Sequence, residues 1–202
     1  MPKIRALKRI IDEIKKIGVP YYIHCGLGVF LQTGFHDASN LDDVDIRLQA
    51  TTIDEDLYNH FNKLSDSSLV KLRGPIQLHG NYMCSNCLTV ELQGVHFDII
   101  GEMITNSPDL GIIEYPLKKS WFEQVDHIKY SNMVLPVLKA EPLLLYYLVS
   151  RRNSDTGKTD FTNIKVLAST KNFSEERFVK MLNDYFEPAK RDKLLELYHQ
   201  YK

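Results

Sequence analysis

The sequence lacks the long apolar runs and the one-sided charge that mark several classes of protein. Its longest uninterrupted apolar stretch covers residues 142–149, whereas a transmembrane helix needs roughly 20 such residues. The formal net charge at pH 7 is −1, so the bulk charge does not call for a nucleic acid or an anionic membrane as partner. We therefore expect no membrane partner, and the net charge does not indicate nucleic acid.

Cysteine is also scarce. The chain has three cysteines in 202 residues, and an odd, small number argues against a disulfide framework. An amphipathic pattern begins at the first residues, without a secretory signal. Both observations predict a cytoplasmic location. Cys84 and Cys87 are spaced as C-x-x-C, but a structural zinc site needs four ligands and the chain has no second such pair. We favour buried thiols in a hairpin over zinc there.

Apolar periodicity predicts a mixed α/β part followed by helices. The expected elements of the first part are a helix over 3–17, a strand over 21–24, a short helix ending near 33, an acidic strand within 40–48, a helix within 52–64, and short strands between 69 and 100. Four helices are expected after residue 139, over 141–152, 160–168, 174–186 and 190–201. We interpret the chain as α+β, with an α/β core over residues 1–134 and a C-terminal helical subdomain over 135–202.

The acidic strand carries the most specific chemical signal. Side chains alternate between the two faces of a strand, so Asp43, Asp45 and Arg47 are expected to share one face. The aliphatic residues between them would occupy the other. Two acids on one face repel each other unless a cation lies between them. Mg²⁺ is the obvious candidate, because it prefers hard oxygen ligands. Paired carboxylates that bind metal are central to phosphoryl and nucleotidyl transfer.

The order of these motifs resembles the nucleotidyltransferase superfamily, whose fold is shared with the catalytic core of family-X DNA polymerases. That pattern has a strand, a tight glycine turn into a short helix, an Asp-x-Asp strand and a third Asp on a later strand. Here Cys25 and Gly26 fill the turn, Asp43 and Asp45 form the pair, and Asp98 is the third acid. Segments 135–144, 151–152 and 158–164 resemble the C-terminal part of small stand-alone members, namely the antibiotic and toxin-type nucleotidyltransferases.

The resemblance implies a nucleotidyltransferase-like twisted mixed sheet with flanking helices. It also implies Mg²⁺-dependent transfer of a nucleoside monophosphate from ATP or another NTP to a hydroxyl acceptor. That acceptor could be a small molecule, an RNA end or a protein side chain. In this interpretation Asp43, Asp45 and Asp98 bind two Mg²⁺ ions and form the catalytic cluster. Asp98 would lie beside the attacking hydroxyl and accept its proton.

The same resemblance implies a nucleotide-binding role for four further residues. The backbone N–H groups of Cys25 and Gly26 lie at a helix start, where anions are favoured. Arg47 and Lys158 are candidates for neutralising the remaining charge of the triphosphate. Simpler interpretations stay open for both, because Arg47 could sit at a frayed strand end and Lys158 could be a plain surface lysine.

Two other functions stay open. The first is a non-catalytic nucleotide-binding or partner-binding member of the same fold. It is favoured by Cys25 in place of the first turn glycine, and by Ser39-Asn40-Leu41-Asp42 just before the acid pair, where many members carry Arg and Ser or Thr. The second is a structural interaction protein whose acids form only a surface salt-bridge network. The lone residues His24 and His36 receive no role, and Tyr146 and Tyr147 are expected to be core aromatics.

Overall fold

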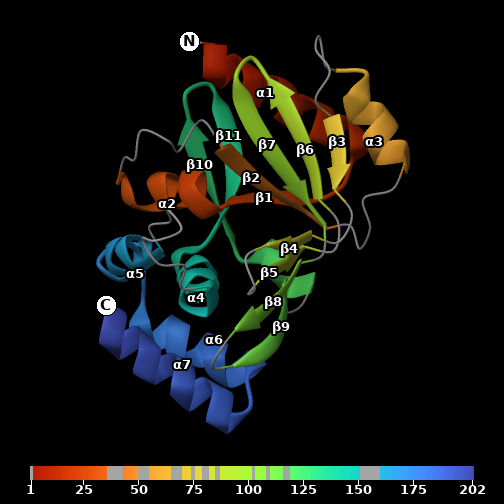
Figure 1. Ribbon diagram of the computed structural model, residues 1–202. Coiled ribbons are helices and arrows are strands. Elements are labelled where there is room, and N and C mark those ends of the chain that lie inside the picture. Colours follow the sequence, from red (N-terminus) through yellow and green to blue (C-terminus); the bar gives the residue numbers. More distant parts are fainter. Residues whose placement is uncertain are drawn as a thin grey trace.

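The computed structural model describes residues 2–35, 43–49, 55–64, 70–73, 76–78, 82–84, 87–101, 103–107, 110–115, 119–150 and 160–202. Within them, a seven-stranded sheet has the order β10-β11-β1-β2-β7-β6-β3 (Figure 1). Its strands are β1 (Tyr21–His24), β2 (Asp43–Leu48), β3 (Val70–Arg73), β6 (Cys87–Leu92), β7 (Val95–Ile100), β10 (Val125–Tyr130) and β11 (Met133–Leu138). The pairs β1–β11 and β2–β7 are parallel and the others antiparallel. The predicted mixed sheet is confirmed.

A second, antiparallel sheet adjoins the first (Figure 1). It has four strands in the order β4-β5-β8-β9. Their bounds are β4 (Ile76–Leu78), β5 (Tyr82–Cys84), β8 (Met103–Ser107) and β9 (Gly111–Tyr115). A short 3₁₀ helix, Lys119–Glu123, leads from this sheet back to β10.

Two hairpins were not predicted from the sequence, namely β8–β9 and β10–β11. The turn between β10 and β11 contains Ser131 at φ 55°. Glycine is the usual residue in this conformation and would have indicated a turn in the sequence. Pro136 lies inside β11, opposite His127, and a proline ordinarily argues against a strand interior. The usual sequence signals for a hairpin are therefore absent between β10 and β11.

The sheet separates two apolar cores. On one face, helices α1 (Pro2–Ile17) and α3 (Glu55–Asn62) cover the aliphatic side of β2. On the other, α2 (Cys25–Thr33) and α4 (Ala140–Ser150) pack against the remaining sheet residues. All residues of α4 are buried, as expected for a helix that is apolar on every side. The aliphatic side of β2 is thus fixed against α1, which directs its alternate residues toward α2 and α4.

The chain continues into helices that pack around α4. These are α5 (Asp160–Ala168), α6 (Glu175–Tyr185) and α7 (Pro188–Tyr201), as predicted. Tyr146 and Tyr147 of α4 are buried core aromatics, also as predicted. The predicted division at residue 134 falls within β11, a member of the main sheet, and stays a prediction. Among the described helices, none is both long and apolar enough to cross a membrane.

Tyr21 of β1 has a buried hydroxyl that forms no hydrogen bond with the described residues. Burial, and to a lesser degree the nearby negative charge of Asp12, raises the pKa of Tyr21 to about 12. A buried polar group without a partner lowers stability. The raised pKa of Tyr21 also makes the stability of the protein change with pH in the alkaline range.

We expect Tyr21→Phe to leave the free energy of unfolding unchanged or to raise it at neutral pH. The pKa of Tyr21 in the folded protein lies above the ordinary value of 10.0. The free energy of unfolding of the wild type is therefore unaffected by the ionisation of this group below pH 10, and falls as pH rises from 10 toward 12 because the unfolded chain ionises first. The variant should lose less over that range. Denaturant unfolding at a series of pH values measures this, with Tyr201→Phe on α7 as a control. Equal alkaline losses in Tyr21→Phe and the wild type would contradict the expectation.

Candidate metal and nucleotide site

A row of four polar residues crosses the centre of the main sheet. His24 lies opposite Asp45, Asp45 lies beside Asp98, and Thr89 lies opposite Asp98. Residues paired in this way point to the same face of a sheet. That face is the one covered by α2 and α4, because the aliphatic neighbours of Asp45 belong to the core under α1. We refer to His24, Asp45, Asp98 and Thr89 as the polar row.

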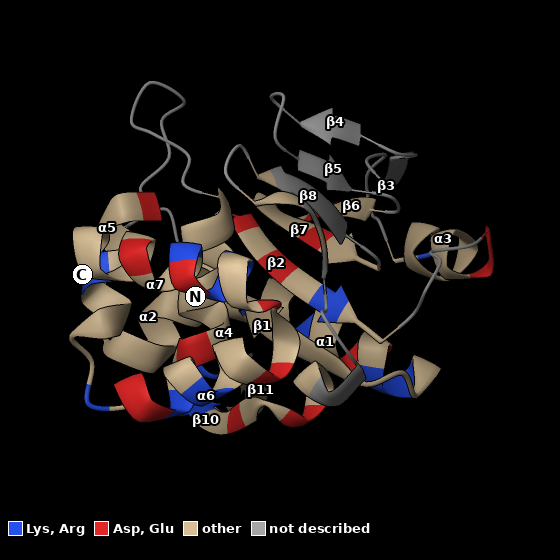
Figure 2. Cartoon of the chain, turned by 90° about the horizontal axis from the view of Figure 1, so that it is seen from below, with Lys and Arg blue, Asp and Glu red and all other residues tan. Residues whose placement is uncertain are grey.

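The predicted acids lie together in this arrangement. Asp45 and Asp98 are in register on parallel neighbouring strands, where backbones are about 4.8 Å apart. Asp43 is two residues from Asp45 on the same strand and is exposed, with His96 as its register partner. Figure 2 shows the acidic segments of β2 and β7 side by side. The structure therefore brings Asp43, Asp45 and Asp98 onto one face, open to solvent at the Asp43 end.

Thr89 fixes one of these carboxylates. Its hydroxyl Oγ1 donates a hydrogen bond of 2.6 Å to Oδ1 of Asp98. Thr89 is buried and Asp98 half-buried, so this bond is shielded from competing water. The second oxygen of Asp98 is not engaged by Thr89. No sequence pattern points to Thr89, because its contact with Asp98 depends on the pairing of β6 with β7.

Helix α2 begins directly beside the polar row. Cys25 follows β1 without a loop and is the first helical residue, at φ 52°. Left-handed backbone is unfavourable for a residue with a side chain and favours glycine, the residue that the resembling proteins have at this turn. Gly26 follows within the first turn of the helix. The binding of a phosphate by the N–H groups of this helix start stays a prediction.

His24 and Cys25 extend the row toward α2. Nδ1 of His24 is 3.1 Å from Sγ of Cys25, and the two side chains are only 3% and 7% exposed. The ring of His24 makes an edge contact with the ring of Tyr146, at 5.7 Å between centroids. The sequence alone assigned His24 no role, because a single histidine before a turn has no diagnostic spacing. Only the pairing of β1 with β2 places it opposite Asp45.

Arg47 is a buried residue and not a surface cation. It shares the face of Asp45 but is 1% exposed, and its partner across the strands is Tyr22. Burial raises the pKa of Tyr22 to about 12, although the positive charge of Arg47 acts in the opposite direction. Arg47 therefore carries a buried side chain on the same face as Asp45, two residues further along β2. Direct contact between Arg47 and a triphosphate stays a prediction.

Some predicted or discussed residues are not among those that the structure describes. Lys158, His36 and residues 39–42 lie outside the described part of the chain. Cys87 is buried, as expected for a thiol in a hairpin, whereas the side chain of Cys84 lies outside the description.

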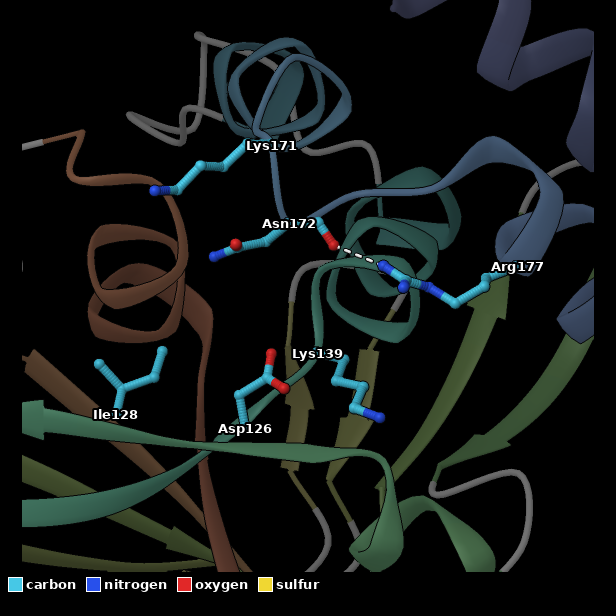
Figure 3. Close-up of a pocket in the computed structure, with 6 residues that line it drawn as sticks. All are labelled: Asp126, Ile128, Lys139, Lys171, Asn172 and Arg177. Atoms are coloured by element: carbon cyan, nitrogen blue, oxygen red, sulfur yellow. Dashed lines mark hydrogen bonds between the residues drawn. The ribbon is translucent and has the colours of Figure 1, made fainter.

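A separate cavity lies near the other end of α2 (Figure 3). Its volume is about 450 Å³, and its lining residues are Asp126, Ile128, Lys139, Lys171, Asn172 and Arg177. Gln32, near the end of α2, donates a hydrogen bond of 3.0 Å to Asp126. Gln32 is seven residues from Cys25, about 10 Å along a helix axis. This cavity is therefore a second polar site and does not include the acids of the polar row.

Known structures share this architecture, although no family model and no curated protein sequence matches the chain. A candidate nucleotidyltransferase from Thermotoga maritima aligns over 76% of this chain and 88% of its own, at 19% identity and a TM-score of 0.55. The antibiotic-resistance factor ANT(2'')-Ia in solution covers 100% of both chains, at 10% identity and a TM-score of 0.57. Its crystal structure with adenylyl-2''-tobramycin covers 98% and 99%, at 10% identity and a TM-score of 0.58.

The chain has a nucleotidyltransferase-like fold. This confirms the fold that the ordered motifs of the sequence predict. Identities of 10–19% establish the fold alone, so the chemistry of this chain must be argued from its own residues.

On the prediction that Asp98 binds Mg²⁺, we expect Thr89→Val to weaken this binding by about 10- to 100-fold, the usual cost of removing a group that orients a metal ligand. Valine keeps the shape of the side chain but cannot hold Oδ1 of Asp98 in place. Thr89→Ser, which keeps the hydroxyl, should bind Mg²⁺ nearly as well as the wild type. Isothermal titration calorimetry measures the affinities. Equal affinities in Thr89→Val and Thr89→Ser would show that the hydrogen bond does not orient the carboxylate.

Proposed function

We propose that the protein transfers a nucleoside monophosphate from an NTP to a hydroxyl acceptor in an Mg²⁺-dependent reaction. One observation carries the proposal, namely the in-register placement of Asp45 and Asp98 beside the exposed Asp43. Three carboxylates on one face supply the oxygen ligands that Mg²⁺ prefers. Without a cation, the two carboxylates on neighbouring strands would repel each other.

The residues present supply the carboxylate oxygens that Mg²⁺ prefers as ligands. Asp43, Asp45 and Asp98 would hold it, and bound Mg²⁺ would supply charge stabilisation for the attacking and leaving oxygens of an in-line displacement. Thr89 holds one oxygen of Asp98, which limits the orientations of that carboxylate. We assign Asp98 the acceptance of the proton from the attacking hydroxyl.

The start of α2 is the proposed phosphate-binding element. The N–H groups of Cys25 and Gly26 belong to the first turn of a helix, where backbone donors and the helix dipole favour anions. Because α2 begins at the end of β1, next to Asp45, a phosphate bound there would lie close to the acids.

The acceptor is best sought among small molecules with hydroxyl groups. The structural neighbour ANT(2'')-Ia has been solved with adenylyl-2''-tobramycin, so an adenylyl donor and a small acceptor are natural first choices. The near-neutral charge of the chain, −1 at pH 7, disfavours a long polyanion as acceptor.

A specific observation favours the alternative of a non-catalytic nucleotide-binding or partner-binding protein. Cys25 has φ 52° at the turn where glycine would be unstrained, and its side chain occupies space that glycine would leave open. If this side chain excludes the productive position of the phosphates, the nucleotide would bind without turnover.

The assay uses NTPs labelled at the α-phosphate, with a pool of hydroxyl acceptors and Mg²⁺. We expect label on an acceptor, release of pyrophosphate, and loss of both when Mg²⁺ is chelated. Asp45→Asn should lower the rate by about 100-fold or more, because a neutral amide binds Mg²⁺ poorly. Asp126→Asn, on β10 of the same sheet, is the matched control and should retain the activity.

Two results separate the alternatives. Tight binding of NTP with Mg²⁺ but no turnover with any acceptor would support the non-catalytic function. Turnover that is unchanged in Asp45→Asn would exclude the polar row as the catalytic site.

A further inference from the structure

Three different metal-binding groups converge at the junction of β1, α2 and β2. One ligand atom each from His24, Cys25 and Asp45 lies within 4.8 Å of the other two. The histidine and cysteine side chains are buried, and Asp45 is half-buried. An imidazole nitrogen, a thiol sulfur and a carboxylate oxygen thus meet at one point next to the proposed magnesium site.

This donor set is not one that suits Mg²⁺. Thiolate and imidazole are softer ligands, typical of Zn²⁺, whereas Mg²⁺ prefers oxygen. In a tetrahedral zinc site, Zn–S and Zn–N bonds of about 2.3 and 2.05 Å place sulfur and nitrogen about 3.6 Å apart. Nδ1 of His24 and Sγ of Cys25 are 3.1 Å apart, so these two ligands would have to separate by only a few tenths of an ångström.

We propose that His24, Cys25 and Asp45 form a Zn²⁺ site with three protein ligands. The fourth position of a tetrahedral ion would be left to water or another small ligand, as in zinc sites that are not purely structural. Binding requires only these three side chains and does not depend on a nucleotide.

The backbone at Cys25 supports a role for the thiol. Its φ of 52° is strained for any residue with a side chain, and such strain concentrates at functional sites. Glycine at this position would build the same turn without strain. The fold therefore does not need a cysteine here, and a metal ligand accounts for a thiol at this turn.

The site shares Asp45 with the proposed magnesium cluster. This inference rests on the proposed function: Zn²⁺ and Mg²⁺ compete for the carboxylate of Asp45. Zn²⁺ bound by three ligands would keep Asp45 turned toward His24 and away from Asp98, its neighbour on the other side. Zinc would then inhibit nucleotidyl transfer.

The first experiment measures binding without nucleotide or Mg²⁺. The full chain is freed of metal with a chelator and titrated with Zn²⁺ against a fluorescent competitor, and in parallel with Co²⁺, whose thiolate complexes absorb in the near ultraviolet. We expect one Zn²⁺ per chain and a cobalt–thiolate band. Cys25→Gly should abolish the band and weaken Zn²⁺ binding at least about tenfold, and His24→Asn should weaken it similarly.

Cys87→Ala is the matched control. Its buried thiol lies on β6, which β2 and β7 separate from β1, so this variant should keep both the band and the affinity. Circular dichroism checks that each variant is folded. Wild-type protein that shows no cobalt–thiolate band would overturn the proposal without reliance on any variant. A band that persists in Cys25→Gly would also overturn it.

The second experiment repeats the nucleotidyl-transfer assay with Zn²⁺ at several Mg²⁺ concentrations. Inhibition that Mg²⁺ relieves supports the shared carboxylate, and inhibition insensitive to Mg²⁺ contradicts it. The two proposals fail separately. Zinc binding without any transfer activity would refute only the proposed function, whereas transfer without zinc binding would refute only the zinc site.

Discussion

The structure depends on the placement of two like charges side by side. Asp45 and Asp98 occupy matching positions on parallel strands at the centre of the sheet. Carboxylates at such a spacing repel each other, and a fold built only for stability would avoid the pair. A neighbouring polar group binds one of the two acids, because the Thr89 hydroxyl donates a hydrogen bond to Asp98. Arg47 is buried on the same face of β2 as Asp45.

The rest of the fold holds this pair rigidly. On the far side of the sheet, the aliphatic residues of β2 are buried against α1, so a slip of one residue would move them into the polar row. On the near side, buried α4 packs against α2, where the Cβ of a residue at position 28 would lie 3.4 Å from Leu143. The start of α2 is therefore packed closely against α4 at this position.

Periodicity predicted most of this frame. Alternation placed Asp43, Asp45 and Arg47 on one face, and the helical spacing of apolar residues gave α1 and the C-terminal helices. What periodicity could not supply was pairing between strands. The pairing of β1 with β2 brings His24 to Asp45, and that of β6 with β7 brings Thr89 to Asp98. Periodicity also did not predict β11, because its interior proline argues against a strand. The alternation of side chains could not show that Arg47 is buried.

We propose above that Asp43, Asp45 and Asp98 converge on a bound divalent cation. The most direct measurement is a crystal structure of the full chain with Mn²⁺ and a non-hydrolysable NTP analogue, using the anomalous signal of manganese to locate the ion. We predict an anomalous peak between the carboxylates of Asp45 and Asp98, with the triphosphate at the start of α2. Carboxylates that show no peak, with nucleotide bound elsewhere in the protein, would contradict the account.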